Sequence, residues 1–260
     1  MHMLSVKTLL SLCLAISLAV STRAAAVEIK ILCTHAFKEA VIEAGAQFEK
    51  ETGNKLSIIY GTTGDIVKRI NAGEPADVVI ASASAVQDLA KAGKIVPGSN
   101  IPAARTGVGI AVRAGAPKPD IHSVEALKRS LLAAKSIAYS NPKDGGTSGI
   151  HFAQVVQRLG IAEQLKPKTI LIGGGGNVGE AVARGEAEMG VQMTTELLPV
   201  PGTQYVGPLP DELQNMIVFA VGIGANGQQR DAGSAFIKFL LSPRGISILK
   251  ASGLEPVAQK

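Results

Sequence analysis

Apolar residues follow two alternating patterns along the chain. Short runs rich in Val, Ile and Leu, such as 28–32 and 56–60, predict β-strands. Longer stretches with apolar residues at helical spacing, such as 37–51 and 65–72, predict amphipathic helices. This alternation is typical of βαβ units, in which parallel strands form a sheet flanked by helices.

The same alternation continues to the C-terminus, with interruptions at the proline-rich segments 97–102, 199–202 and 208–210. The remaining predicted strands are 77–81, 107–113, 136–139, 169–172, 187–192 and 217–223. The remaining predicted helices are 85–92, 124–134, 148–159, 178–184, 231–241 and 243–251. Two α/β lobes are the simplest arrangement of this series.

Residues 1–26 have the layout of an export signal. Lys7 supplies the positive charge, residues 9–20 form the apolar stretch, and three alanines at 24–26 form a small-residue cleavage site. The apolar stretch is shorter than the about 18 residues that a membrane helix needs, and no later stretch reaches that length. We therefore expect a soluble, exported protein, cleaved near Ala26 and not embedded in a membrane.

Composition and charge narrow the possible partners. With 46% apolar and 18% charged residues the chain has material for a large core, which excludes a disordered scaffold. Aromatic residues make up 3% and Trp is absent, which disfavours ligands that bind by ring stacking. Without the signal, 24 basic face 21 acidic residues, and no basic cluster predicts nucleic-acid binding. Cys33 is then the only thiol, and no spacing predicts a metal site or a cofactor.

Several strings resemble those of periplasmic solute-binding proteins of the molybdate-binding type. They are residues 31–37 (ILCTHAF), 60–64 (YGTTG), 70–78 (INAGEPADV), 148–150 (SGI) and 188–191 (EMGV). The resemblance implies a two-lobed type II binding-protein fold, each lobe a mostly parallel sheet flanked by helices, with two crossing strands between the lobes. It places lobe 1 at 27–105 plus 218–260 and lobe 2 at 106–217. It also implies a small anionic ligand, an inner-membrane ABC permease as partner, and a monomer.

In such a fold the strand-to-helix loops would face one cleft, where helix N-termini present free N–H groups and a positive dipole end. Hydroxyl groups there can donate to ligand oxygens without adding a charge. The alternative is that these Thr and Ser residues only cap helices, and Thr62 with Asp65 has capping-box spacing. The candidate ligand-binding residues are Thr34, His35, Ala36, Thr62, Thr63, Gly64, Thr147, Ser148, Asn177, Gln192, Met193 and Thr194.

The chain also departs from the molybdate-binding pattern. Ala36 stands where that family has a ligating serine, Met193 where it has a tyrosine, and Thr63 or Gly64 where it has a second serine. The loop 141–147 looks roomier, which suits an organic anion. Framework segments 116–121, 136–140, 183–187 and 196–202 resemble the branch that includes bacterial aconitate isomerase, an enzyme on the same fold.

Two functions from different classes follow. The first is a binding protein that captures a small anion, an organic carboxylate, for an ABC transporter. The second is an aconitate isomerase, in which His35 at a predicted helix N-terminus would be the catalytic base, unless it only hydrogen-bonds a ligand oxygen. Molybdate or tungstate binding ranks below both. The string GGGNVG at 174–179 satisfies a dinucleotide motif, but no acid follows at the end of the next strand, so nucleotide binding is disfavoured.

Overall fold

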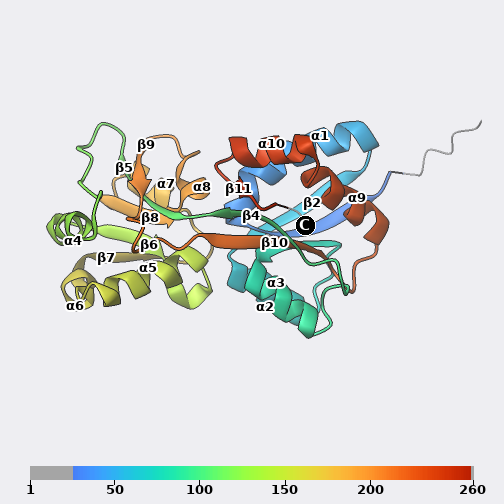
Figure 1. Ribbon diagram of the computed structural model, residues 1–260, viewed down its shortest axis with the longest axis horizontal. Coiled ribbons are helices and arrows are strands. Elements are labelled where there is room, and N and C mark those ends of the chain that lie inside the picture. Colours follow the sequence, from blue (N-terminus) through green and yellow to red (C-terminus); the bar gives the residue numbers. More distant parts are fainter. Residues whose placement is uncertain (1–25, 259–260) are drawn as a thin grey trace, which may run out of the picture.

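The computed structural model describes residues 26–258 and has two lobes, each with one sheet between layers of helices (Figure 1). The predicted export signal lies outside the described residues except for Ala26. The sheet of lobe 1 has the order β11-β4-β10-β3-β1-β2, and that of lobe 2 the order β7-β6-β8-β5-β9. The chain passes from one sheet to the other between β4 and β5, and returns between β9 and β10.

The strands of lobe 1 are β1 (Glu28–Thr34), β2 (Lys55–Gly61), β3 (Val78–Ser82), β4 (Ile101–Thr106), β10 (Ile217–Ile223) and β11 (Glu255–Pro256). Its helices are η1 (His35–Phe37), α1 (Lys38–Thr52), α2 (Thr63–Asn71), α3 (Ala83–Lys91), α9 (Arg230–Leu240) and α10 (Pro243–Ala251). Strands β1, β2 and β3 run parallel, whereas β10 is antiparallel to β3 and β4.

The strands of lobe 2 are β5 (Val108–Arg113), β6 (Ile137–Ser140), β7 (Thr169–Ile172), β8 (Met189–Met193) and β9 (Thr203–Pro208). Its helices are α4 (Val124–Ala133), η2 (Pro142–Asp144), α5 (Thr147–Arg158), α6 (Ala162–Leu165), η3 (Lys166–Lys168), α7 (Val178–Ala183) and α8 (Thr194–Leu197). Here β6, β7 and β8 run parallel, and β5 is antiparallel to β8 and β9. The predicted two-lobed α/β fold is confirmed.

Both faces of the central strands are buried, which explains their nearly continuous apolar sequences. In β1, Ile31 and Cys33 belong to the core under α1, α9 and α10, while Leu32 packs on the opposite face with Ile66 of α2. Phe48 of α1 meets Phe236 of α9 edge-on at 5.3 Å between ring centroids. Because β1, β2 and β3 run parallel, as do β6, β7 and β8, the strands of each group end at the same edge of their sheet. These carboxyl ends point toward the other lobe (Figure 1).

The sequence pattern did not predict two of the longer strands or several very short elements. Strands β4 and β9 contain Pro102 and Pro208, and proline removes a hydrogen-bond donor from a strand. Strand β9 lies at an edge of its sheet, and the pairing of β4 with β10 shifts register opposite Pro102, so both positions tolerate proline. The short elements β11, α6, α8, η2 and η3 have two to four residues each, too few to show a period.

The lobes touch through α2 and the loop that precedes α5. The Thr62 hydroxyl donates to the Asp144 carbonyl oxygen at 2.7 Å, and Gly64 N donates to the Gly145 carbonyl oxygen at 3.2 Å. A Cβ atom on Gly64 would lie 2.7 Å from the Gly145 Cα atom. Because real Cβ atoms do not approach so closely, glycine at position 64 permits this contact between the lobes.

Candidate functional site

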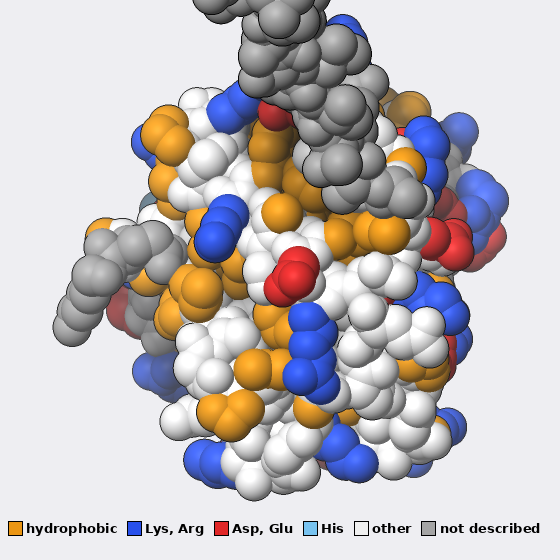
Figure 2. Space-filling model, turned by 90° about the vertical axis from the view of Figure 1, so that its right-hand side faces the viewer, with side chains coloured by type: hydrophobic (Ala, Val, Ile, Leu, Met, Phe, Trp, Pro, Cys, Tyr) orange, Lys and Arg blue, Asp and Glu red, His pale blue; other side chains and the backbone are white. Residues whose placement is uncertain are grey.

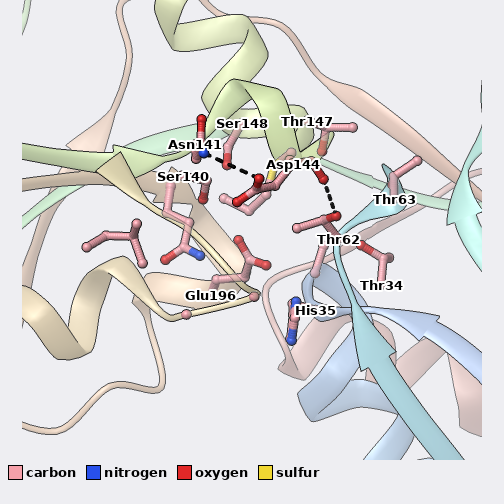
Figure 3. Close-up of a pocket in the computed structure, with 17 residues that line it drawn as sticks. Thr34, His35, Thr62, Thr63, Ser140, Asn141, Asp144, Thr147, Ser148 and Glu196 are labelled. Carbon is pink, nitrogen blue, oxygen red and sulfur yellow. Dashed lines mark hydrogen bonds between the residues drawn. The ribbon is translucent and has the colours of Figure 1, made fainter. Parts of the chain in front are cut away.

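A cavity lies between the lobes where the carboxyl ends of the parallel strands meet, and we call it the interlobe cavity (Figure 3). The volume inside it that water-sized molecules can occupy is about 20 Å³. Ligand sites of open α/β sheets lie at this end of the strands. The cavity is lined by Thr34, His35, Ala36, Thr62, Thr63, Ser140, Asn141, Asp144, Gly146, Thr147, Ser148, Ile172, Gly175, Gly176, Gln192, Met193 and Glu196.

The N-terminus of α5 opens onto this cavity without a cap. Gly146 precedes the helix, so no side chain satisfies the first backbone N–H groups. Thr147 and Ser148 occupy the first turn, and within residues 26–258 no hydrogen bond engages their hydroxyl groups. The hydroxyl of Thr34, at the start of η1 in the other lobe, is likewise without a partner there. Both lobes thus present unsatisfied donors to the same space, which is the chemistry of an anion site.

Other hydroxyl groups predicted to bind ligand already have partners. Thr62 forms a complete capping box with Asp65 at the start of α2, besides its bond to Asp144. The hydroxyl oxygen of Thr63 accepts a bond from Ser82 N at 3.4 Å. The capping alternative is therefore realised at Thr62, although its side chain also lines the cavity.

Nine of the twelve candidate residues line the interlobe cavity, and three do not. Gly64 lies at the contact between the lobes. Asn177 caps α7 by accepting from Glu180 N and lines a neighbouring groove, and the Thr194 hydroxyl pairs with the Tyr205 hydroxyl at 3.0 Å. Ligand binding by the nine lining residues remains a prediction, since the geometry gives their position only.

His35 is partly buried in the wall of the cavity. Its ring stacks on Tyr60, with 6.4 Å between centroids and 25° between planes. Burial lowers its pKa first, and the charge of Lys38 lowers it further, against the opposing effects of Asp65 and the Gly61 backbone. Burial and the Lys38 charge both favour the neutral imidazole.

Two carboxyl groups of lobe 2, those of Asp144 and Glu196, also line the cavity, and neither was predicted from the sequence. Asp144 accepts from Asn141 Nδ2 at 3.3 Å and from Gly174 N at 3.2 Å. Glu196 points into the space between Asp144 and His35 (Figure 3). Burial raises the pKa of Glu196 to about 7, and interactions with the Met193 backbone and the Gln192 side chain oppose part of that rise.

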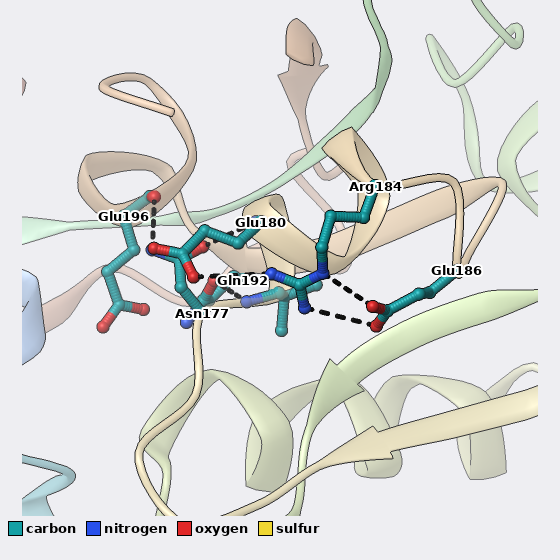
Figure 4. A network of polar contacts seen from close by, with 7 residues as sticks. Asn177, Glu180, Arg184, Glu186, Gln192 and Glu196 are labelled. Carbon is teal, nitrogen blue, oxygen red and sulfur yellow. Dashed lines mark hydrogen bonds and ion pairs between the residues drawn. The ribbon is translucent and has the colours of Figure 1, made fainter. Parts of the chain in front are cut away.

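A polar network holds helix α8, from which Glu196 projects, and the strand β8 that precedes it (Figure 4). Gln192 Oε1 accepts from Val178 N at 3.0 Å, and Asn177 Nδ2 donates to the Glu196 carbonyl oxygen at 3.3 Å. The first bond ties β8 to the start of α7, and the second ties α8 to the residue that caps α7. Position could have been a signal, because Ser140, Asn141 and Glu196 all follow a predicted strand by one to four residues.

His151 in the first half of α5 does not line the interlobe cavity, and its Nε2 atom lies 2.8 Å from the Leu213 carbonyl oxygen. Lys and Arg side chains are scattered over the end of lobe 1 visible in Figure 2 and do not gather into one patch there. Within residues 26–258, no three His, Cys, Asp or Glu side chains are grouped to hold a metal ion. In the same range, no helix is long and apolar enough to cross a membrane.

Comparisons with known proteins agree with this architecture. The family described as bacterial extracellular solute-binding protein matches residues 29–255. An aconitate isomerase from a Pseudomonas species is 34% identical over 233 residues, which is 87% of each chain. The molybdate-binding protein ModA of Azotobacter vinelandii is 28% identical over 240 residues, 88% of this chain and 90% of that protein.

The solved structure of the Azotobacter vinelandii periplasmic molybdate-binding protein has a TM-score of 0.73 at 22% identity, and the match covers 89% of this chain and all of that one. That similarity extends over both lobes and establishes the shared fold. With a family match across nearly all described residues, the chain belongs to the bacterial extracellular solute-binding proteins.

Proposed function

We propose that this protein captures a small organic carboxylate between its lobes. The observation that carries the proposal is the uncapped N-terminus of α5, whose Thr147 and Ser148 line the cavity together with Thr34 of the other lobe. Backbone N–H groups and hydroxyl groups are donors that an anion can use in place of water. A carboxylate is favoured over molybdate because the relative named aconitate isomerase is more similar, at 34%, than the ModA protein, at 28%.

The wall of the cavity supports the same choice. Ala36 and Met193 lack donor side chains, so the wall is only partly polar around the donors of α5 and η1. A tetrahedral oxyanion needs donors on all sides, whereas an organic acid presents both charged and apolar surface. Molybdate or tungstate is therefore the less suitable ligand.

The proposed setting is the periplasm, after removal of residues 1–26. The family is one of extracellular solute-binding proteins, and relatives include a periplasmic one. As partner we propose an inner-membrane ABC permease, which would receive the ligand from a monomeric protein. Closure of the lobes would bury the ligand before delivery, as hinge closure does in binding proteins generally.

One observation favours isomerase activity as a second candidate function. His35 and Glu196 line the same cavity, and at neutral pH the first is neutral while the second is partly protonated. Moving the double bond of aconitate removes a proton from one allylic carbon and returns a proton to another, with no net loss. His35 would act as the base and Glu196 as the acid, with the donors of α5 stabilising charge on a carboxylate.

A proton NMR time course on the purified protein, given trans-aconitate and then cis-aconitate, separates the two candidates. Broadened ligand signals without conversion are expected for a binding protein. Formation of the other isomer above a protein-free blank would establish the enzyme, and loss of that activity in His35→Gln would assign the base. Molybdate and sulfate, tested by thermal shift, complete the panel. If only these oxyanions raise the melting temperature, the carboxylate proposal is wrong.

A further inference from the structure

The interlobe cavity has an unusual charge balance for a site that receives an anion. Two carboxyl groups, Asp144 and Glu196, line it, and within residues 26–258 no lysine or arginine does. His35 is the other titratable group in the wall, and its lowered pKa keeps it uncharged at neutral pH. An incoming anion therefore meets like charge without a compensating cation, unless a proton accompanies it.

The two carboxyl groups differ in how they are held. Asp144 accepts bonds from Asn141 Nδ2 and from the Gly174 backbone N–H. Glu196 instead projects into the cavity, where burial disfavours its charge (Figure 3). Burial therefore favours the protonated form of the Glu196 carboxyl group.

The charged groups around Glu196 do not change this balance. Helix α8 packs against η1, α7, β5, β8 and β9. Beside η1, Lys38 and Glu39 lie with Glu196 along the neighbouring groove, as does Glu180 of α7, which pairs with Arg184 at 3.8 Å. The polar group from β8 is the uncharged Gln192. The polar group from β9 is Tyr205, whose hydroxyl pairs with that of Thr194. The charged residue of β5 is Arg113, which is exposed at the far end of that strand. Lys38 shares that groove with Glu39 and Glu180 and does not line the interlobe cavity.

We infer that Glu196 is a ligand-binding residue that holds a proton when an anion occupies the cavity and donates its O–H group to an anion oxygen. Above neutral pH, each binding event then takes up about one proton from the solvent. The inference rests on the proposed function, since it assigns the proton that accompanies the captured carboxylate.

The acidity of Glu196 in the free protein sets the pH range. With a pKa of about 7 the group is about half protonated at neutrality, and below that pH no proton needs to be added. Above about pH 7, the apparent affinity for an anion falls by about tenfold per pH unit, because binding takes up one proton and the proton concentration falls tenfold per unit. A cavity with ionised acids only would show no such slope.

Isothermal titration calorimetry with trans-aconitate, between about pH 6.5 and 9, measures both quantities. Ordinary carboxyl groups are ionised throughout this range, so the ligand contributes no proton change. In buffers of different ionisation enthalpy, we expect uptake of about one proton at about pH 8.5, less than half a proton at about pH 6.5, and the tenfold slope. Uptake near zero at both pH values, with tight binding, would overturn the inference while leaving the proposed function intact.

Matched variants assign the proton. Glu196→Gln keeps an N–H donor but cannot titrate, so we expect affinity within about fivefold of wild type at about pH 6.5 and no slope above it. Glu180→Gln removes a neighbouring carboxylate that lies outside the cavity, and should keep the wild-type slope. A slope that survives Glu196→Gln, or one that His35→Gln abolishes while Glu196 is intact, would assign the proton elsewhere.

A second readout needs no ligand. Carbon-13 NMR of the free protein, with labelled glutamate, should show one carboxyl group that titrates near pH 7, and Glu196→Gln should remove that signal. If the Glu196 carboxyl is fully ionised at about pH 6, the inference is wrong whichever anion binds. If neither trans-aconitate nor molybdate binds but the titration is found, the proposed function fails and the protonated Glu196 stands.

Discussion

At the scale of single residues, the Thr62 side chain makes two separate hydrogen-bond contacts, one within lobe 1 and one to lobe 2. Its side chain accepts from Asp65 N at the start of α2, and its hydroxyl donates to the Asp144 carbonyl oxygen in the other lobe. The first contact stabilises lobe 1, and the second exists only while the lobes touch. Substitutions can separate a loss of stability from a loss of closure.

We expect Thr62→Val to lower the free energy of unfolding by about 1–2 kcal/mol, the usual effect of losing a helix cap. It should also weaken anion binding by about fivefold, because one net hydrogen bond of about 1 kcal/mol is lost on closure. Thr62→Ser should preserve both. Chemical denaturation and calorimetry provide the measurements.

Ser123 offers a matched control, since it caps α4 by accepting from Ala126 N, far from the cavity. Ser123→Ala should lower stability by about 1 kcal/mol and leave affinity unchanged. Equal affinity in Thr62→Val and wild type would mean that the bond between the lobes does not support closure.

Glu196 predicts a pH-dependent stability in the free protein. Its folded pKa of about 7 lies above the ordinary glutamate value, so the unfolded chain releases this proton first as pH rises. The folded state therefore loses stability between about pH 4.5 and 7, and the loss is complete above that range. Glu196→Gln should be more stable than wild type by about 1–3 kcal/mol at about pH 8 and nearly equal at about pH 4.

Thermal unfolding at both pH values tests this expectation, with Glu180→Gln as the control for removing a nearby exposed acid. An identical gain at the two pH values would show that charge burial is not the cause.

At the scale of elements, the close approach of α2 to the loop before α5 depends on two glycines. Gly64 N donates to the Gly145 carbonyl oxygen, and a Cβ atom on either residue would clash with the backbone of the other. Gly64 lies inside α2, where alanine is the better helix former. A substitution there can block the contact between the lobes without harming the helix.

Gly64→Ala should therefore keep or raise the melting temperature while weakening anion binding by more than about tenfold, since one clash of this kind costs over about 1.4 kcal/mol. Small-angle X-ray scattering with trans-aconitate should show no compaction in this variant. Asn71→Ala, at the exposed end of the same helix, should behave as wild type. Normal compaction in Gly64→Ala would mean that closure follows another path.

At the scale of the whole molecule, two segments join the lobes, and one residue links them. Gln214 accepts from Val108 N at 2.9 Å and donates to the Val108 carbonyl oxygen at 2.8 Å, as a neighbouring strand would. Both connections therefore cross at one place, beside the first residue of β5. We expect the lobes to rotate about this place on closure, since the other bonds between them described above lie at the cavity.

Export is a prediction for the complete chain. Expressed with residues 1–26, the protein should be recovered from the periplasm with the mass of residues 27–260, because the signal is removed near Ala26. A chain that lacks residues 2–26 should stay in the cytoplasm with its mass unchanged. Periplasmic recovery of the shortened chain, or an uncut full-length product, would contradict the assignment.

The local sequence pattern determined most of the helices and strands, and it determined at which end of the strands the site lies. Strand β10 and helix α10 have the predicted bounds, because β10 is an unbroken apolar run and α10 begins with Pro243 after the capping residue Ser242. Hydroxyls and glycines after successive strands predicted which loops would face one cleft, since parallel strands end at the same edge of a sheet. Nine candidate residues accordingly line the cavity.

Tertiary structure decided the rest. Whether a threonine caps a helix, as Thr62 does, or remains free, as Thr34 does, depends on partners that packing supplies. Strand β9 and helix α8 exist because neighbouring elements provide the hydrogen bonds and burial that their own sequences do not encode. The acidity of Glu196 follows from the same cause: burial between lobes is a property of chain segments far apart in sequence, and no local pattern records it.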